Sequence, residues 1–268
     1  MRIDSHVHSS LSPDSSIEPT DAIRLLAREG LGCCFTDHVD YVVHEAGQDT
    51  GADDAPRAEA DFIMRNHESH PLELLKYRGE GVFIGVEVGL NRAFLQANEE
   101  IGSREGLDFT VGSVHYVDGW GIHDNYFKNY RGDHYRRMLE YAREMVELNG
   151  YIDSLGHIDY ISRYSPLAEK NVLYSNYSDE YDALFAALAS RDMALEINTQ
   201  RFGDPKSEAC AYQVYKRFRA RGGRFVTIGS DAHTHRELGR YYKRALKMAR
   251  ETGLSVVCHR GHIPQKSN

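Results

Sequence analysis

Two histidines stand two residues apart near the start of the chain, in the segment D-S-H-V-H-S that contains His6 and His8. Alternate residues of a β-strand point to the same face, so a strand here would present both imidazoles side by side. Two imidazoles in that position can share one metal ion, because histidine is the commonest metal ligand in proteins. The same spacing also occurs on ordinary surfaces, so the prediction of a metal site depends on further ligands elsewhere in the chain.

Histidines and carboxylates also stand at the ends of other short apolar segments. These segments are GCCFTDH, VFIGVEV, FTVGSVH, IDSLGHID and FVTIGSDAH, and they carry Asp37, His38, Glu87, His115, His157, Asp231 and His233. Burying so many polar and ionised groups together without a cation would be costly. The pattern therefore predicts a centre of several metal ions. Imidazole and carboxylate ligands without thiolate indicate Zn, Mn, Fe or Co.

A centre of this composition is typical of hydrolytic enzymes. Paired metal ions lower the pKa of a bound water and neutralise the charge that develops on phosphoryl oxygens. Phosphate esters are therefore the substrate class that we expect.

Apolar segments alternate with helical patterns along the chain. The expected strands are Met1–Ser5, Gly32–Thr36, Val82–Val88, Phe109–Val114, Ile152–Leu155, Met193–Ile197, Phe225–Ile228 and Ser255–Cys258. The expected helices are Pro19–Glu29, Asp133–Leu148, Asp179–Ser190, Lys206–Ala220 and Gly239–Glu251. This alternation predicts parallel βα units and an α/β fold. Seven or eight units favour a (β/α) barrel, complete or distorted, in which the strand ends share one face. An open doubly wound sheet is the alternative.

Two stretches interrupt the alternation, and we expect the whole chain, residues 1–268, to form a single domain. The long polar segment 41–81 contains an amphipathic stretch, Arg57 to Tyr77. It predicts a mostly helical insertion over one end of the barrel. The segment 116–132 is rich in aromatic residues and predicts an irregular loop that packs locally or forms a rim. The tail, residues 260–268, is expected to be frayed.

The composition of the chain limits the classes of molecule that it is expected to bind. The chain has 268 residues and a net charge of −8, without an extended basic stripe, which argues against nucleic-acid binding. No apolar run approaches the length of a membrane span, and the N-terminus lacks a signal-peptide pattern. The four cysteines form no C-x-x-C pair, which predicts reduced thiols and a cytoplasmic protein. The expected partner is a small phosphorylated substrate.

The motifs DSHVHS, TDH, GVE, SVH, GHID and SDAH resemble, in this order, those of the polymerase and histidinol phosphatase (PHP) family. The resemblance runs from Asp4 to His233. In length and in the segments GHIDYISRY and LEINTQR, the chain most resembles the PHP-type histidinol-phosphate phosphatases. This resemblance implies a distorted (β/α)7 barrel with three divalent transition-metal ions (Zn, Mn or Fe). It also implies hydrolysis of L-histidinol phosphate to L-histidinol and phosphate in histidine biosynthesis.

The resemblance also implies a division of the metal ligands among three ions. The ligands of the first ion would be His6, His8, Glu87 and Asp231. Glu87 would bridge to a second ion, whose other ligands would be His115 and His157. The ligands of the third ion would be Asp14, His38 and His233. The assignment of Asp14 depends on spacing through SSLSPDSS, where an aspartate also fits a turn.

Further residues are predicted to act on the substrate. Besides the bridging Glu87, either Asp231 or His233 is expected to protonate the leaving alkoxide. Arg163 and Arg201 each follow a strand-end motif and are predicted phosphate clamps, because a guanidinium offers a bidentate fork to phosphate.

Tyr116, at the start of the aromatic loop, is a further substrate-binding candidate, and His123 and His235 lie near motifs. Asp4 and Asp37 stand beside ligand histidines and are expected to orient their imidazoles, with a solvent-facing position as the alternative for Asp4. Glu196 falls inside a buried strand, where a carboxylate needs a partner, so we expect it either to support a metal ligand or to pair with an arginine.

Two other functions stay open. One is a nuclease or nucleotide phosphoesterase of the same family, although an acidic chain disfavours a long nucleic-acid substrate. The other is a metal-binding accessory barrel without catalytic activity.

Overall fold

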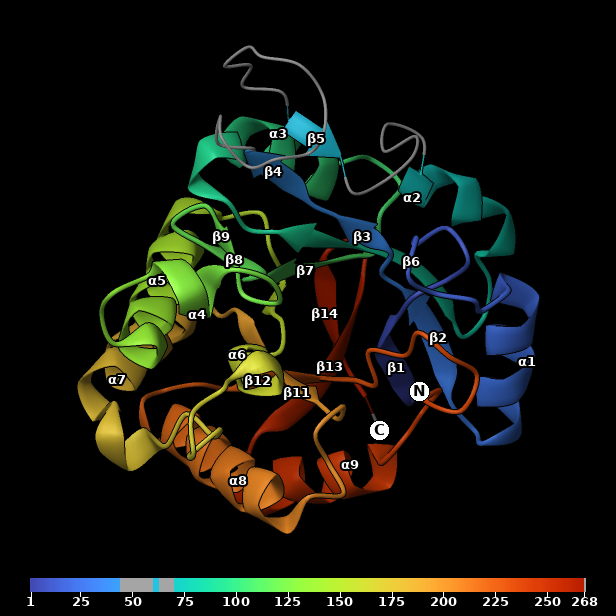
Figure 1. The fold of residues 1–268 in the computed structure, drawn as a ribbon. Coiled ribbons are helices and arrows are strands. Elements are labelled where there is room, and N and C mark those ends of the chain that lie inside the picture. The colour runs from blue at the N-terminus through green and yellow to red at the C-terminus, as the bar shows by residue number, and fades with distance from the viewer. Residues whose placement is uncertain (44–59, 63–69, 268) are drawn as a thin grey trace.

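The computed structural model describes residues 1–43, 60–62 and 70–267. Seven strands lie side by side in chain order, and each neighbouring pair is parallel (Figure 1). They are β1 (Ile3–Val7), β2 (Gly32–Phe35), β6 (Val82–Gly89), β7 (Phe109–Ser113), β10 (Ser154–Leu155), β11 (Ala194–Asn198) and β12 (Phe225–Gly229). One isolated parallel bridge, between Val7 and Ala232, brings the end of this series back beside β1. Because the last contact is a single bridge and not a full ladder, the fold is a distorted (β/α)7 barrel.

Helices surround the strands on the outside of the barrel (Figure 1). The longer ones are α1 (Pro19–Arg28), α3 (Leu95–Gly102), α5 (His134–Leu148), α7 (Ser178–Ser190), α8 (Pro205–Ala220) and α9 (Tyr242–Thr252). α5 begins where the Asp133 side chain accepts hydrogen bonds from the N–H groups of Tyr135 and Arg136. Its buried residues recur every three or four positions, so one face of the helix is turned toward the interior of the protein. None of the described helices combines the length and apolar character needed to cross a lipid bilayer.

The last expected strand lies outside the seven-stranded series. β13 (Ser255–Arg260) pairs with β12 only at Phe225 and Val226, and then turns back into β14 (Ile263–Lys266). Cys258 of β13 joins a buried apolar cluster with residues near the N-terminal ends of three strands, among them Ile3 and Phe109. The hairpin therefore covers the end of the barrel opposite the strand C-termini. The prediction of a frayed tail was wrong for residues 260–266, because residue 260 ends β13, residues 261 and 262 form a turn, and β14 pairs antiparallel with β13.

The predicted insertion, 41–81, lies partly outside the described residues, since 44–59 and 63–69 are not described. β4 (Tyr41–Val43) and β5 (Ala60–Phe62) form an antiparallel pair, so the prediction of helix was wrong for 60–62. Helical turns follow in α2 (His70–Glu73) and in η1 (Leu74–Tyr77). The assignment of the whole chain to one domain stays a prediction.

The aromatic segment 116–132 is more regular than predicted. It contains a short hairpin, β8 (Tyr116–Val117) with β9 (Trp120–Gly121), followed by the single turn α4 (Tyr126–Asn129). Tyr126 is buried, and its ring lies 5.3 Å from that of His134 on α5. Most of these aromatic rings therefore pack locally, as ordinary core residues do.

The remaining described elements are short. They are β3 (His38–Val39), η2 (Arg92–Phe94), α6 (Ile161–Tyr164) and η3 (Tyr174–Asn176). β3 pairs with β6 in register His38 to Glu87, which sets these two side chains next to each other. The four cysteines are free thiols.

Candidate metal centre

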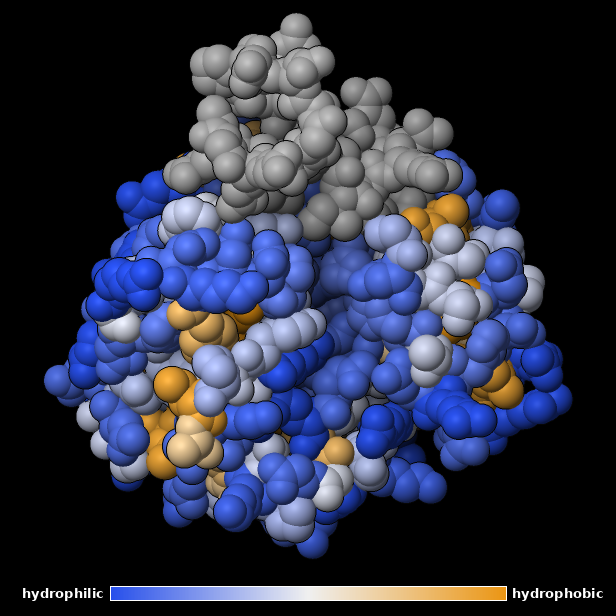
Figure 2. All heavy atoms as spheres, viewed as in Figure 1, coloured by the Kyte–Doolittle hydropathy of each residue, from blue (hydrophilic) through white to orange (hydrophobic). Residues whose placement is uncertain are grey.

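The predicted ligands converge at the C-terminal ends of the barrel strands. β1 extends two residues further than predicted, so His6 lies within the strand and His8 follows directly after it. Glu87, near the end of β6, is fully buried at the centre of the group. A cavity of about 560 Å³ opens above these residues. Figure 2 shows a hollow lined by hydrophilic residues on this face.

The first group of donor atoms comes from β1, β6 and the segment after β12. Nε2 of His6 lies 3.4 Å from Glu87 Oε2 and 3.7 Å from Asp231 Oδ1. Nε2 of His8 lies 3.4 Å and 3.3 Å from the same two oxygens. Asp231 reaches this position with a left-handed backbone, φ 54°, which aspartate tolerates better than most residues.

The second group shares Glu87 with the first. Its Oε1 lies 3.3 Å from Nε2 of His115 and 2.8 Å from Nε2 of His157. The two carboxylate oxygens of Glu87 thus face different sets of imidazoles, which is the arrangement of a bridging ligand.

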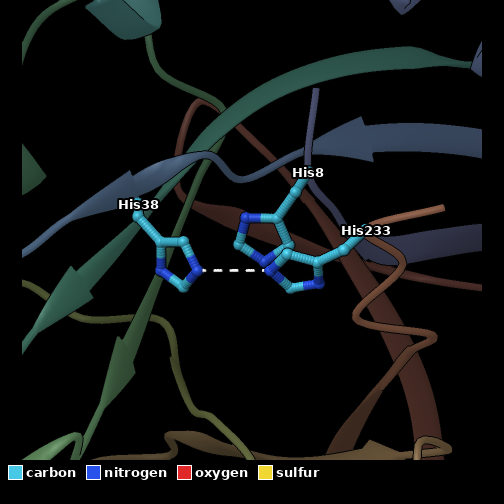
Figure 3. A group of neighbouring side chains, drawn as sticks. All are labelled: His8, His38 and His233. Atoms are coloured by element: carbon cyan, nitrogen blue, oxygen red, sulfur yellow. Dashed lines mark hydrogen bonds between the residues drawn. The ribbon is translucent and has the colours of Figure 1, made fainter. Parts of the chain in front are cut away.

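The third group lies closer to the cavity mouth. Nε2 of His38 and Nε2 of His233 are 3.4 Å apart, with the ring of His8 beside them (Figure 3). Oδ2 of Asp14 lies 3.5 Å from the first nitrogen and 3.3 Å from the second. Asp14 is brought there because Ser15 and Ser16 bond to the backbone carbonyls of His8 and His233. The structure thus brings all nine predicted ligands together.

The donor atoms fit divalent metal ions. Nε2 of His6, Nε2 of His8 and Oε2 of Glu87 are buried and lack a hydrogen-bond partner within the described part of the chain. Ligand bonds of about 2.1 Å in a tetrahedral arrangement would place donor atoms roughly 3.4 Å apart. The separations of 3.3–3.7 Å in the first group match that spacing. The cluster therefore has the geometry and chemistry of a divalent-metal site.

Electrostatics keep the carboxylates of the centre ionised. Burial alone would raise the pKa of Glu87, but His38, His6 and His115 outweigh it and hold that pKa well below its usual range. Burial opposes ionisation of Asp231 in the same way, and Arg163 together with His6 lowers its pKa well below the ordinary value. Both groups are therefore ready to act as anionic ligands.

Glu196 orients His6 from behind, as its burial in the sequence pattern suggested. Oε1 of Glu196 accepts a hydrogen bond from Nδ1 of His6 at 2.7 Å, and Oε2 accepts one from the His157 backbone N–H at 2.7 Å. The hydrogen-bonded side chains of Glu196 and His6 lie next to Gly229, where an added Cβ would be only 2.2 Å from Glu196 Oε1. Glycine at position 229 therefore leaves the space that this hydrogen bond occupies.

Asp40 is a functional residue that the sequence analysis missed. Its Oδ1 lies 2.8 Å from Nδ1 of His115, so the carboxylate fixes the ring with Nε2 toward Glu87. Gly89 makes room for it, because a Cβ there would lie 1.7 Å from Asp40 Oδ1. The signal was present in the sequence: Asp40 stands two residues after His38, the same spacing as His6 and His8.

Asp37 acts on an imidazole through an intermediate hydroxyl. Oδ1 of Asp37 accepts a hydrogen bond from the Ser12 hydroxyl at 2.6 Å, and that hydroxyl lies 3.1 Å from Nδ1 of His8. Asp4, by contrast, accepts hydrogen bonds from the backbone N–H groups of Ser230 and Gly239 at 2.8 Å and 2.9 Å. Asp4 therefore braces the backbone around the site and does not orient a ring as predicted.

The two predicted phosphate clamps have different positions. Arg163 lines the cavity, where its Nη2 donates to Asp231 Oδ2 at 2.7 Å and its guanidinium lies 5.1 Å from the Tyr160 ring centroid. Arg201 does not line this cavity. Its guanidinium is bonded to Asp159, Asn171 and Ser207 beside a separate small pocket between α7 and α8.

The substrate-binding candidate Tyr116 lines the cavity, and so does His123, one of the two histidines that lie near motifs. His235 does not, and its Nε2 lies 3.4 Å from Asp21 at the surface. The difference arises because the turn after His233 carries position 235 outward into solvent.

Comparisons with known proteins agree with this site. A model of the PHP domain family matches residues 4–200. A probable histidinol-phosphatase of Clostridium acetobutylicum is 33% identical over 263 residues, which is 96% of each chain. A histidinol-phosphatase of Lactococcus lactis is 28% identical over 241 residues, covering 87% of this chain and 84% of that protein.

A solved structure of a relative also has a similar fold. The crystal structure of histidinol phosphate phosphatase from Lactococcus lactis, complexed with zinc, L-histidinol and phosphate, matches with a TM-score of 0.82. It covers 99% of both chains at 26% identity. The sequence resemblance is confirmed by a family match that spans most of the chain and by a relative that covers nearly all of it. The chain therefore belongs to the PHP domain family.

Proposed function

We propose that this chain is a metal-dependent histidinol-phosphatase, which hydrolyses L-histidinol phosphate to L-histidinol and phosphate. The observation that carries the proposal is the convergence of five imidazoles on the two carboxylate oxygens of Glu87, at the foot of a cavity that also holds Arg163. The named relatives and the solved structure with L-histidinol and phosphate support the choice of substrate.

The proposal includes three divalent ions per chain, with Zn, Mn or Fe as the metals. The first would be held by His6, His8, Glu87 and Asp231, the second by Glu87, His115 and His157, and the third by Asp14, His38 and His233. Donor separations of 3.3–3.5 Å in the Asp14 group support a separate third ion. The zinc in the Lactococcus lactis enzyme supports a metal of this class.

The bound ions and the side chains of the cavity would have different roles in catalysis. Bound divalent ions would activate the attacking water and neutralise charge on the phosphoryl oxygens. Arg163 would bind a phosphoryl oxygen, since only Nη2 of its guanidinium donates hydrogen bonds to described residues. His233 would hold the proton that the leaving alkoxide receives, and Asp231 would not, because the pKa of its carboxylate is held well below the ordinary value. We infer Tyr116 as a further substrate contact, and we omit Arg201 because its donors are bonded elsewhere.

The proposed enzyme would work in the cytoplasm on a small monoester, without a nucleic-acid partner. The free cysteines support a reducing compartment. The aromatic rings that line the cavity support a small substrate with a planar group.

Phosphate release over a panel of esters tests the proposal. L-histidinol phosphate should give a much higher kcat/KM than nucleotides or phosphodiesters, and elemental analysis should give more than one transition metal per chain. A nucleotide or diester with the highest kcat/KM would overturn the substrate. One equivalent of metal or less, with no gain of activity on adding Mn or Zn, would overturn the metal centre.

A further inference from the structure

Four carboxylates line the cavity. Three of them contact a histidine or an arginine side chain. Asp14 contacts His38 and His233, Asp40 contacts His115, and Asp231 contacts Arg163. The first three are therefore committed to the metal centre or to its supporting hydrogen bonds. The fourth carboxylate, Glu237, has a different environment.

Glu237 is half-buried and is held by neutral donors. Its Oε2 accepts hydrogen bonds from the His233 and Thr234 N–H groups at 3.1 Å and 2.9 Å, and from the Thr234 hydroxyl at 2.9 Å. The side chain of Gln200 also hydrogen-bonds to it. Among the described residues no cationic side chain forms an ion pair with Glu237. The carboxylate is thus fixed in place at the cavity wall with its charge uncompensated.

Aromatic rings form another part of the same cavity. Tyr160 and Tyr164 have ring centroids 5.2 Å apart, and His123 lies 6.3 Å from Tyr164 and 5.8 Å from Tyr116. Tyr164 is 43% exposed, so its ring is open to a ligand. A row of such rings suits a planar, partly apolar group. With divalent ions bound at its base, the cavity would therefore combine a cationic floor with this aromatic wall and with Glu237, a carboxylate that has no ion-pair partner among the described residues.

We propose that Glu237 is a specificity-determining residue that binds the ammonium group of the substrate and selects phosphate monoesters of amino alcohols. The inference rests on the proposed function and deepens it. The metal ions that attract the phosphate would repel an ammonium group on the neighbouring carbon. A substrate that carries both charges needs a carboxylate that is not a metal ligand, and Glu237 supplies it directly beside His233.

The geometry also allows a purely structural role for Glu237. Thr234 and Glu237 have the spacing of a capping box, in which the glutamate satisfies backbone N–H groups at the start of a turn. The substitution Glu237→Gln separates the two roles. Its amide carbonyl can still accept the hydrogen bonds from His233 and Thr234, whereas the negative charge is lost.

The experiment compares two substrates that differ only in the amine. L-histidinol phosphate and imidazolylpropyl phosphate, the analogue without the amine, are assayed with the wild type, Glu237→Gln and the control Glu251→Gln. Glu251 is an exposed residue on α9 that pairs only with Lys247 among described residues, so its substitution removes the same charge far from the cavity. The measured quantity is the ratio of the two kcat/KM values.

The wild type and the control should prefer the amine substrate. Glu237→Gln should reduce that preference by about tenfold or more, through KM, with the rate on the analogue within about twofold of the wild type. Equal losses on both substrates would show a structural role and overturn the proposal, as would an unchanged ratio.

The outcome of the wild-type assay separates this inference from the proposed function. Efficient cleavage of L-histidinol phosphate by Glu237→Gln with an unchanged ratio would leave the phosphatase function standing and remove only the ammonium site. A wild type that prefers another amino-alcohol phosphate would overturn the proposed substrate. The ammonium site would then be supported if Glu237→Gln abolished that preference. A wild type with no preference for an amine would overturn the ammonium site as well.

Discussion

Glu196 and His6, 190 positions apart in the sequence, are joined by a fully buried hydrogen bond of 2.7 Å between Oε1 and Nδ1. Since the carboxylate accepts this bond, Nδ1 carries the proton, and Nε2, which faces Glu87 and Asp231, keeps the lone pair that a metal ion would use. A carboxylate behind a metal-binding imidazole fixes its tautomer and raises its basicity. Glu196 of β11 therefore fixes the orientation and the tautomer of the His6 ring on β1.

Glu196→Gln should weaken metal binding without unfolding the chain. A glutamine side chain keeps the shape, but its charge is gone and the imidazole of His6 becomes less basic. Loss of such a supporting carboxylate typically costs about 10- to 100-fold in metal affinity or activity. Metal content after dialysis against a mild chelator measures the effect. Asp192→Asn, which alters an exposed pair with Arg224, is the control, and equal metal retention in both variants would contradict the role of Glu196.

Gly229→Ala should disrupt the hydrogen bond between Glu196 and His6 by steric overlap. The new methyl group would lie 2.2 Å from Glu196 Oε1 and 2.5 Å from Cβ of His6, so at least one of them must move. Overpacking of this kind costs about 1–3 kcal/mol, and we expect a lower Tm together with lost metal. Gly150→Ala is the matched control, because a Cβ there meets no atom within 4 Å. Wild-type metal content in Gly229→Ala would refute the argument.

The side chains of the candidate centre could be located from the sequence because strand ends are easy to find and the residue types are chemically informative. His115 and His157 each follow a short apolar run that the structure shows as a barrel strand, β7 and β10. The residues that support the ligands are harder to assign, because a carboxylate near a histidine in sequence need not contact it. Asp4 and Asp40 illustrate this: the first was expected to orient a ring and does not, while the second does and was overlooked.

Asp40→Asn should impair the second donor group selectively. Asp40 fixes His115 through the 2.8 Å hydrogen bond to Nδ1, and an asparagine would keep the size but lose the charge that favours this bond. We expect a fall in kcat of about tenfold or more, with partial loss of metal and little change in Tm. Steady-state kinetics with elemental analysis on the same sample measures this. Full activity with full metal content would exclude a role for Asp40.

Other features depend on tertiary contacts that no local pattern indicates. β14 has the sequence I-P-Q-K and four exposed residues, so it shows no apolar alternation, and backbone pairing with β13 holds it in place. Arg201 follows a strand end at the expected spacing, yet the turn after β11 directs it to Asn171 and Ser207. Sequence spacing locates a residue near a strand end, whereas the turn conformation decides where its side chain goes.

His262 should make the stability of the C-terminal hairpin depend on pH. Its Nδ1 lies 2.9 Å from Asp153 Oδ2, and that hydrogen bond raises the pKa of His262 above its ordinary value despite partial burial. A raised histidine pKa means that the folded state binds the proton more tightly. The stabilisation is therefore complete below about pH 6.5 and disappears as the pH rises through the raised pKa.

The comparison of the wild type with His262→Asn tests this pH dependence. Asparagine tolerates the left-handed backbone of this position, φ 62°, so the variant changes mainly the titrating group. The difference in free energy of unfolding, from denaturant titrations across pH 5 to 9, should be largest at the acidic end and shrink toward the alkaline end. A difference that is constant with pH, or that grows toward pH 9, would contradict the assignment.

Arg163→Ala and Arg201→Ala should have distinct effects although both arginines follow strand ends. Arg163 lies in the cavity beside Asp231, with its guanidinium against the ring of Tyr160. Its removal should lower kcat/KM by about tenfold or more, with a weaker inhibition by inorganic phosphate, because a charge-assisted contact to the phosphoryl group is lost. Arg163→Lys should recover only part of this, since an ammonium lacks the planar fork.

Arg201→Ala should act on stability and not on phosphate binding. The guanidinium joins Asp159, Asn171 and the Ser207 hydroxyl, which hold the segment after β10 against the start of α8. Its loss leaves these partly buried polar groups without a partner, so we expect a lower Tm with little change in the inhibition constant of phosphate. The inhibition constant of phosphate and the Tm of both variants, measured on metal-loaded protein, decide the matter. If Arg201→Ala weakened phosphate binding as much as Arg163→Ala, Arg201 would have to leave its three partners during catalysis, and its assignment as a phosphate clamp would be restored.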